Sequence, residues 1–234
     1  MQMSSKRAVL DFLGQRQWRR VLDAPCGHGW LGEGLRGRYD AIDGMDLFCD
    51  APEGYGAFWK QDLDRAFPSD VGAYDLICCC EGIEHVGNPL LLLREFHRVL
   101  KPGGQLLVST PNVWFPQSRM QFFLRGFFPS FPSLADKVIP GTHMHIMPWS
   151  WPQLYVYFKL AGFGLPEILE EPLSRPKHLY ECILGLPSKW HSASRLKRAR
   201  TEEERAYWKQ AASSASRLGR HLIVHARRAG EDPS

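Results

Sequence analysis

The chain has 234 residues, 44% of them hydrophobic, and a formal net charge of +4, so it can bury the core of one generous domain, which we expect to span 1–234. No apolar run is long enough to span a bilayer, and charges interrupt the apolar residues of 1–20, unlike a secretory signal. Cys78, Cys79 and Cys80 are adjacent and cannot form ordinary disulfides with one another, so we expect reduced thiols and a cytoplasmic location.

Positive charge is concentrated towards the end of the chain. From Lys189 onward eleven Lys and Arg oppose five Asp and Glu, which gives 11 − 5 = +6, and the preceding part sums to 4 − 6 = −2. A solvated helix face accounts for such a run, and an anionic partner such as nucleic acid or phospholipid is the alternative. There is no strong nucleic-acid signal, and peripheral membrane contact and a homodimer stay open.

In residues 21–32 a short apolar run ends at Asp23, a glycine turn follows and a helical pattern begins, which predicts strand, tight loop and helix. Three interpretations compete: a structural turn, a dinucleotide loop in which Gly27, Gly29 and Gly32 fit G-x-G-x-x-G, and a site for a ligand without phosphate. A carboxylate at the loop entrance would repel a pyrophosphate and attract an ammonium group. Asp23 therefore favours the third interpretation.

This loop resembles the first motif of class I S-adenosylmethionine-dependent methyltransferases, in which an acidic residue ends the first strand and a glycine loop holds the amino-acid part of the cofactor. Pro25 stands where that family often has glycine. The resemblance implies cofactor contacts from the strand end and the loop, namely Asp23, Ala24, Cys26, Gly27 and Gly29.

Residues 39–47 predict a second strand that ends in an acid. Asp46 follows the first glycine of the loop by 46 − 27 = 19 positions, which suits an acid that binds ribose hydroxyls. Asp40 and Asp43 are rivals for that role, and a solvated loop aspartate without a role is the remaining alternative. The resemblance favours Asp46, with Leu47 beside it.

A third short strand over 58–63 also ends in an acid. By the same resemblance, Asp62 holds the adenine amino group and Leu63 packs on the ring. Residues 74–80 form a continuous apolar run, the pattern of a parallel strand buried on both faces. This strand leads into Glu81, which the resemblance adds to the cofactor site.

Three further motifs follow in the family's order. They are Glu-x-x-Glu-His-Val at 81–86, Lys-Pro-Gly-Gly at 101–104 after an amphipathic helix, and Ser-Thr-Pro-Asn at 109–112 after a fifth strand. The resemblance then covers 21–112 and is closest to the branch with the ubiquinone-biosynthesis O-methyltransferases. It implies an α/β fold with a Rossmann-like, doubly wound, seven-stranded sheet, mostly parallel with the last strand antiparallel, and an aromatic-rich insertion after strand five.

Residues 113–149 form that insertion, in which phenylalanines and tryptophans fall among prolines and glycines. The segment leaves the fifth strand beside the ligand crevice of an open α/β sheet, so we expect an acceptor pocket or lid. A subdomain packed on itself or on a second copy is the alternative. Residues 172–216 are expected to be a variable connection with a basic helix, opened by a capping box at Thr201.

Methyl transfer to a hydroxyl needs in-line geometry and a base or a metal for the proton. Glu81, Glu84 and His85 stand at i, i+3 and i+4, so one helical turn would place them on a common face. With His143 or His145 they resemble the metal site of small-RNA 2′-O-methyltransferases, which implies bound Mg, Mn or Zn. Alternatively Glu84 and His85 are structural and a later histidine is a metal-free base, so the catalytic candidates are His143, His85 and His145.

The combined prediction is an S-adenosylmethionine-dependent methyltransferase that acts on oxygen of a small-molecule acceptor. A quinone, phenol, sugar or lipid precursor would each serve, and nothing in the sequence selects among them. The alternatives are an RNA ribose 2′-O-methyltransferase, a non-catalytic S-adenosylmethionine-binding partner protein, and an NAD-dependent oxidoreductase, which Asp23 disfavours.

Overall fold

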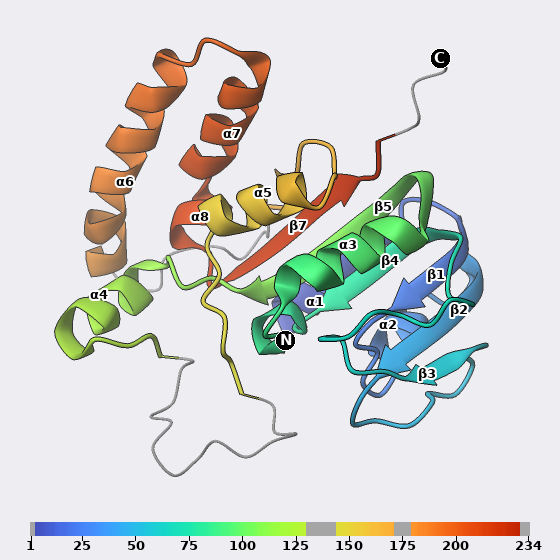
Figure 1. Cartoon of the computed structure of the whole chain (residues 1–234). Helices are drawn as coiled ribbons and strands as arrows, with labels where there is room; N and C mark the ends of the chain where they lie inside the picture. Colours follow the sequence, from blue (N-terminus) through green and yellow to red (C-terminus); the bar gives the residue numbers. More distant parts are fainter. Residues whose placement is uncertain (1–2, 130–143, 171–178, 230–234) are drawn as a thin grey trace.

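A computed structural model describes residues 3–129, 144–170 and 179–229. Within these residues seven strands form one sheet in the order β3-β2-β1-β4-β5-β7-β6 (Figure 1). The strands are β1 (Trp18–Asp23), β2 (Tyr39–Asp46), β3 (Phe58–Lys60), β4 (Tyr74–Cys80), β5 (Leu100–Pro111), β6 (Glu167–Ile168) and β7 (His221–Arg227).

The sheet is parallel from β3 to β5, and β7 is antiparallel to both β5 and β6. The order of the strands reverses between β1 and β4, which are neighbours with Asp23 opposite Cys78. In open α/β sheets, ligands bind in the crevice outside the strand ends at such a reversal. The predicted doubly wound, seven-stranded sheet with an antiparallel last strand is confirmed.

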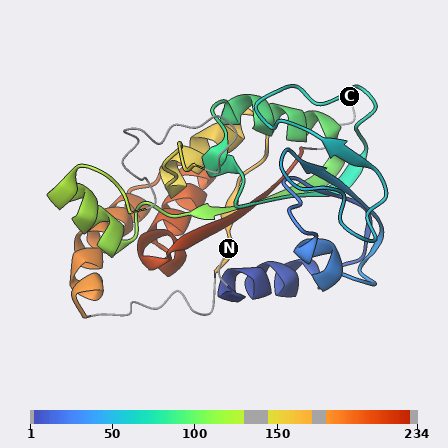
Figure 2. The same ribbon diagram turned by 90° about the horizontal axis from the view of Figure 1, so that it is seen from below.

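Helices cover both faces of the sheet. α1 and α2 lie on one face, and α3 and α5 lie on the other (Figure 2). Their bounds are α1 (Met3–Leu13), α2 (Trp30–Gly34), α3 (Pro89–Val99) and α5 (Trp151–Leu160), and a short 3₁₀ turn, η1 (Ile83–His85), precedes α3. No helix in the described part of the chain combines the length and apolarity needed to cross a bilayer.

The central strand β4 is covered on both sides. Ile77 and Cys79 pack in the apolar cluster of α3 and α5, whereas Cys78 and Cys80 pack in the cluster of α1 and α2. All four side chains are buried, as expected of a central parallel strand. The continuous apolar run at 74–80 therefore predicted this strand correctly.

The remaining helices gather near the end of β5 and the start of β7, which pair with each other. They are α4 (Pro116–Arg125), α6 (Leu179–Lys197), α7 (Glu202–Ala212) and α8 (Ser214–Leu218). α6 and α7 form a hairpin, and α4 lies beside α6 at the end of the molecule opposite β3 (Figures 1 and 2). α7 confirms the helix predicted after Thr201, whose Oγ1 accepts the Glu204 N–H at 3.0 Å. α6 occupies residues that the sequence pattern predicts only as a connection.

Asp43, a rival of Asp46 in the sequence, is a structural carboxylate that is 4% exposed. Its Oδ2 accepts hydrogen bonds from the Arg20 guanidinium at 2.9 Å and from the Tyr74 hydroxyl at 2.9 Å, and its Oδ1 accepts the Ala57 N–H at 2.8 Å. Buried polar groups are stable when they are paired in this way. Asp43 therefore joins β1, β2 and β4 and is not presented to a ligand.

We predict that Asp43→Ala lowers the free energy of unfolding by about 2–3 kcal/mol, because it leaves a buried hydroxyl and part of a guanidinium unpaired. Asp40→Ala is the matched control, since Asp40 is exposed and accepts only a long bond of 3.5 Å from Gln17. Urea unfolding of both variants measures the effect. Equal stability of the two variants would contradict the structural role of Asp43.

Candidate functional site

A cleft of about 420 Å³ lies at the carboxyl ends of β1, β2 and β4 in the described chain. Four segments line it: the glycine loop after β1, the turn after β2, the loop after β3 and the turn after β4. The lining residues are Pro25, Cys26, Gly27, Trp30, Asp46, Leu47, Phe48, Cys49, Gln61, Asp62, Leu63, Asp64, Cys80, Glu81, Gly82, His85 and Val86.

The cleft brings together most of the residues that the sequence predicts for the cofactor. The predicted cofactor residues that line the cleft are Cys26, Gly27, Asp46, Leu47, Asp62, Leu63 and Glu81. The other three, Asp23, Ala24 and Gly29, lie outside the lining. Their roles toward a cofactor stay predictions.

The glycine loop turns tightly at two residues with positive φ, Gly27 (+53°) and Gly29 (+80°). A Cβ on Gly29 would lie 2.5 Å from Pro52 Cβ, so no larger residue fits there without a shift. A Cβ on Gly27 would meet nothing within 4 Å. Glycine is favoured there by its positive φ and not by lack of space, and the space beside it is open to the cleft.

Asp46 fastens this loop to the end of β2. Its Oδ2 accepts the Gly27 N–H at 2.9 Å, and its Oδ1 accepts the N–H groups of Phe48 and Cys49, each at 2.8 Å. A carboxylate has about four lone-pair positions. These bonds occupy both positions on Oδ1 and one on Oδ2, so Oδ2 retains one position for a hydroxyl.

Asp23 lies behind the lining and is almost fully buried. Its Oδ2 accepts the Tyr55 hydroxyl at 2.6 Å, whereas its Oδ1 has no hydrogen-bond partner among the described residues. Burial raises the pKa of Asp23 to about 7; the Tyr55 bond lowers it and the charge of Asp46 raises it. A buried carboxylate with one unpaired oxygen is costly, and a neighbouring cation would relieve that cost.

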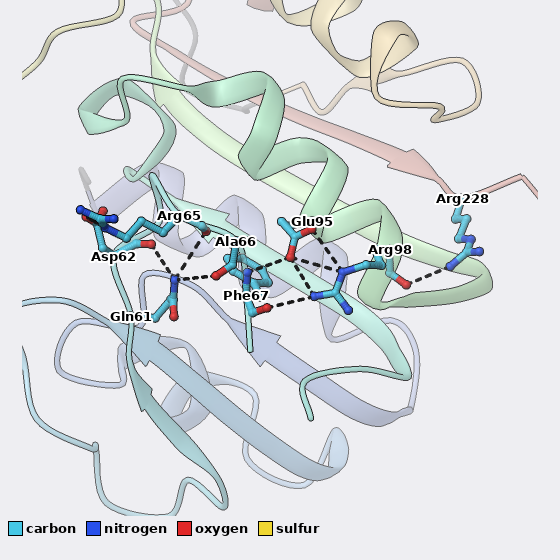
Figure 3. A network of polar contacts seen from close by, with 8 residues as sticks. All are labelled: Gln61, Asp62, Arg65, Ala66, Phe67, Glu95, Arg98 and Arg228. Atoms are coloured by element: carbon cyan, nitrogen blue, oxygen red, sulfur yellow. Dashed lines mark hydrogen bonds and ion pairs between the residues drawn. The ribbon is translucent and has the colours of Figure 1, made fainter. Parts of the chain in front are cut away.

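The loop that carries Asp62 and Leu63 is tied to α3 by a polar network (Figure 3). Gln61 Nε2 donates to the backbone oxygen of Asp62 at 2.7 Å. Farther along, Glu95 of α3 accepts the Phe67 N–H at 2.8 Å, and the Arg98 guanidinium binds Glu95 at 2.8 Å. The first bond thus holds the loop on itself beside the cleft, and the second holds the far end of the loop on α3.

Glu81 ends β4 in a left-handed conformation, with φ of +55°. Non-glycine residues held in this region often belong to functional sites. Its carboxylate accepts the Ser109 hydroxyl at 3.2 Å and lies 3.5 Å from His221 Nε2. Burial acts to raise its pKa, but the hydrogen bond and charge of His221 outweigh burial and lower it.

Glu84 lies in the short turn η1, and its carboxyl group has surroundings different from those of Glu81. It is buried, its Oε2 accepts the Thr110 hydroxyl at 3.0 Å, and its Oε1 has no hydrogen-bond partner among the described residues. Burial and then the charge of Glu81 raise its pKa to about 8. The expectation that one helical turn aligns Glu81, Glu84 and His85 is wrong, because Glu81 lies outside η1 and turns away at its positive φ.

His85 and His145 meet at the edge of the cleft. Their rings lie edge to face with centroids 4.8 Å apart. His85 Nδ1 lies 2.9 Å from the Met144 carbonyl oxygen, which can only accept, so Nδ1 carries the proton and Nε2 has the lone pair. Burial and then the neighbouring His85 lower the pKa of His145, and Glu81 partly offsets them.

Three of the predicted metal ligands gather in one place. One ligand atom each from Glu84, His85 and His145 lies within 4.8 Å of the others. Glu81 is not part of this group. His143, the other predicted histidine, lies outside the described residues. The unpartnered Oε1 of Glu84 and the two imidazoles fit a divalent ion, and the metal site stays a prediction.

None of the described residues of the insertion 113–149 lines the cleft. Phe122, Phe123 and Phe127 are exposed on or after α4. Residues 130–143 lie outside the described chain. The acceptor-pocket role of the insertion therefore stays a prediction.

The sequence does not indicate the partners that hold the acidic residues in place. Tyr55 and His221 bind Asp23 and Glu81 from 55 − 23 = 32 and 221 − 81 = 140 positions away. No local pattern marks either residue. Only the pairing of β7 with β5, which puts His221 opposite Pro111, reveals the second contact.

Comparisons with known proteins agree with this geometry. A model of a family described as "Methyltransferase domain" matches residues 2–167. The ubiquinone biosynthesis O-methyltransferase of Pseudomonas aeruginosa (strain LESB58) is 32% identical over 105 residues, which are 40% of this chain and 45% of that protein. The chain thus spans about half the length of the curated relatives it matches.

Two solved structures share the fold along nearly the whole chain. The YcgJ protein of Bacillus subtilis has a TM-score of 0.59 at 14% identity and covers 98% of this chain and 100% of its own. An S-adenosylmethionine dependent methyltransferase from Mesorhizobium loti has a TM-score of 0.53 at 17% identity, with 94% and 96% covered. At such low identity these likenesses support the fold.

We predict that the contribution of Asp23 to stability falls as pH rises from about 4 to about 7. The folded protein holds the Asp23 proton more tightly than the unfolded chain, so deprotonation in this window costs up to about 4 kcal/mol. Asp23→Asn removes that loss, so its stability relative to the natural protein should grow across the window and stay constant above it. Urea unfolding at several pH values measures this.

Asp70→Asn is the matched control, because Asp70 is exposed and its variant should follow the natural protein at every pH. If Asp23→Asn and the natural protein had parallel pH profiles, Asp23 would not titrate in this range.

Proposed function

Because the chain belongs to the family of class I S-adenosylmethionine-dependent methyltransferases, we propose that it transfers the methyl group of S-adenosylmethionine to a hydroxyl oxygen of a small molecule. One observation carries the proposal. The ends of β1, β2 and β4 meet at a single cleft whose wall holds Asp46, Asp62 and Glu81, and the histidine pair His85 and His145 lies at its edge.

The cofactor would lie along the cleft with its adenosine near β2 and β3. Asp46 Oδ2 offers one remaining position to a ribose hydroxyl, and Asp62 and Leu63 would receive the adenine. The positively charged amino group would approach the glycine loop, where the unpaired oxygen of buried Asp23 attracts it. Glu81, held by Ser109 and His221, adds a second negative charge on the β4 side.

The reaction needs the acceptor oxygen in line with the sulfonium methyl carbon, and it needs the hydroxyl proton removed. The O–C bond forms as the S–C bond breaks, and S-adenosylhomocysteine leaves with the electron pair. His145, whose pKa is lowered by burial, is neutral near pH 7 and can accept a proton. His85, with its lone pair on Nε2, is the second candidate base, and His143 stays a candidate from the sequence.

A divalent ion is compatible with the same residues. Glu84, His85 and His145 would hold it, and their mixed oxygen and nitrogen donors suit Mg, Mn or Zn. Such an ion, when bound, makes a hydroxyl bound near it more acidic. Glu81 would remain with Ser109 and His221.

Similarity to the Pseudomonas enzyme, which is named for ubiquinone biosynthesis and O-methylation, supports a phenol or quinol hydroxyl as the acceptor. A sugar or lipid precursor remains the wider class. A ribose hydroxyl of RNA is the second candidate acceptor, and the observation that supports it is the same group of Glu84, His85 and His145.

We predict that S-adenosylhomocysteine binds the natural protein, and that Asp62→Ala weakens its affinity by about ten- to hundredfold through loss of one charge-assisted hydrogen bond. Asp70→Ala, an exposed acid away from the cleft, should bind normally. Isothermal titration calorimetry measures both. Binding of NAD in place of the adenosyl compounds would overturn the cofactor assignment.

We predict that His145→Ala slows methyl transfer by at least about a hundredfold, the usual effect of losing a general base or metal ligand, with unchanged affinity for S-adenosylhomocysteine. Mass spectrometry of phenols, sugars and an RNA oligonucleotide after reaction would detect a gain of one methyl group. His191→Ala is the control, because His191 is an exposed residue of α6 and its loss should leave the rate unchanged.

Chelation separates the two mechanisms. Full activity after exhaustive chelation would exclude the metal and leave the histidine base. Loss of activity that returns with Mg, Mn or Zn would support the ion. No methylation of any acceptor, with normal S-adenosylhomocysteine binding, would indicate a non-catalytic binding protein.

A further inference from the structure

Helix α6 is amphipathic, but its apolar side faces away from the protein. The residues that it buries against its neighbours are small or polar: Glu181, Gly185 and Ser192. Its large apolar side chains face away from the protein at a spacing of three or four residues: Leu179, Ile183, Leu186 and Trp190, of which Ile183 is 58% and Trp190 is 67% exposed. A helix of a globular protein normally turns that stripe toward the core. The stripe therefore calls for an apolar partner outside the described chain.

Helix α4 extends this apolar surface. It lies beside α6 in both views (Figures 1 and 2), and Phe123 of α4 lines a groove together with Leu184 of α6. Phe123 is 83% exposed and the neighbouring Leu124 is also exposed. We use the name α4–α6 face for the set Phe123, Leu124, Leu179, Ile183, Leu186 and Trp190. Exposed apolar side chains gathered on two adjacent helices mark an interaction site.

The same elements are strongly basic. Residues 116–129 and 179–200 contain seven Lys and Arg and one acid, which gives 7 − 1 = +6. The acid is Glu181, which is buried and bound to Arg220 at 3.0 Å. The six exposed cations are Arg125, Lys189, Arg195, Lys197, Arg198 and Arg200. Within these two segments no exposed acid opposes the six cations, and the nearest exposed acids of the hairpin are Glu202, Glu203 and Glu204 at the start of α7.

Cations also gather at the tip of the α6–α7 hairpin. Arg195, Arg198 and Arg200 line a cavity of about 300 Å³ with Trp208 and one acid, Glu204. The Arg195 guanidinium lies over the Trp208 ring at 5.2 Å. No ion pair joins these three side chains to a carboxylate in the described chain. Three cations against one acid leave a net positive charge at the cavity, which favours an external anion.

A further guanidinium lies inside the groove between α4 and α6. Arg119 lines the groove and stacks on Trp114, with 4.6 Å between the guanidinium carbon and the ring centre. Its Nε and Nη2 are buried and have no hydrogen-bond acceptor among the described residues. A buried guanidinium without an acceptor adds positive charge beneath this surface.

We propose that the α4–α6 face binds the surface of a membrane that contains anionic phospholipid. Exposed aromatic and aliphatic side chains enter the boundary between headgroups and acyl chains, and surrounding Lys and Arg neutralise lipid phosphates. A second copy of the chain fits this surface poorly, because two faces of charge +6 would repel each other. The proposal does not depend on the methyl-transfer reaction.

The test is sedimentation of the full chain with vesicles of phosphatidylcholine alone, or with roughly a third of phosphatidylglycerol. We expect binding to the anionic vesicles, weaker binding at high salt, and little binding to phosphatidylcholine alone. Ile183→Asp combined with Trp190→Asp, and Lys197→Glu combined with Arg198→Glu, should each weaken binding by at least about tenfold.

The matched controls make the same kinds of substitution on exposed residues outside α4 and α6. Val156→Asp with Leu160→Asp alters exposed apolar residues of α5, and Arg36→Glu with Arg38→Glu alters exposed cations after α2. Both controls should bind vesicles normally. Unchanged melting temperature and S-adenosylhomocysteine affinity show that each variant is folded.

Three results would overturn the proposal. The first is failure of the natural protein to bind anionic vesicles at about 0.1 M salt, and the second is an equal loss of binding in the controls. The third is a dimer, seen by sedimentation velocity, that Ile183→Asp with Trp190→Asp abolishes while vesicle binding is absent, since a second copy would then cover the face. Failure of methylation leaves these readouts unaffected.

Discussion

The cleft depends on the carboxylate of Asp46. Three backbone N–H groups from two separate segments, the glycine loop and the turn after β2, converge on its two oxygens. The loop can therefore keep the positive φ angles of Gly27 and Gly29 without help from a ligand. A carboxylate that organises the backbone of its own site is already in position when a ribose arrives, so little rearrangement is needed on binding.

Two carboxylates of one short motif have opposite electrostatics. Glu81 and Glu84 are three positions apart, yet the pKa of Glu81 is lowered and that of Glu84 is raised. Burial acts on both in the same direction. Glu81 differs because it contacts His221, whereas the charge of Glu81 itself adds to the burial of Glu84. Two titratable groups whose surroundings move their pKa values in opposite directions commonly take different roles in one site.

The sequence predicted the sheet well because the information for it is local. The apolar run at 74–80 has no other stable place than the middle of a sheet, and an acid after each strand must lie at the carboxyl edge. The helical alignment of Glu81 with His85 was wrong because the positive φ of Glu81 follows from its contacts with β5 and β7. α6 was missed although its apolar residues recur at helical spacing, because Pro187 lies inside the helix and proline usually ends one.

Arg220 and His221, the residue before β7 and the first residue of β7, connect two distant parts of the protein. Arg220 binds Glu181 of α6 at 3.0 Å and Gln117 of α4 at 3.1 Å, while His221 lies 3.5 Å from Glu81 at the cleft. The contacts of α4, of α6 and of Glu81 thus meet at one peptide bond, so the position of this backbone segment is set from both sides at once.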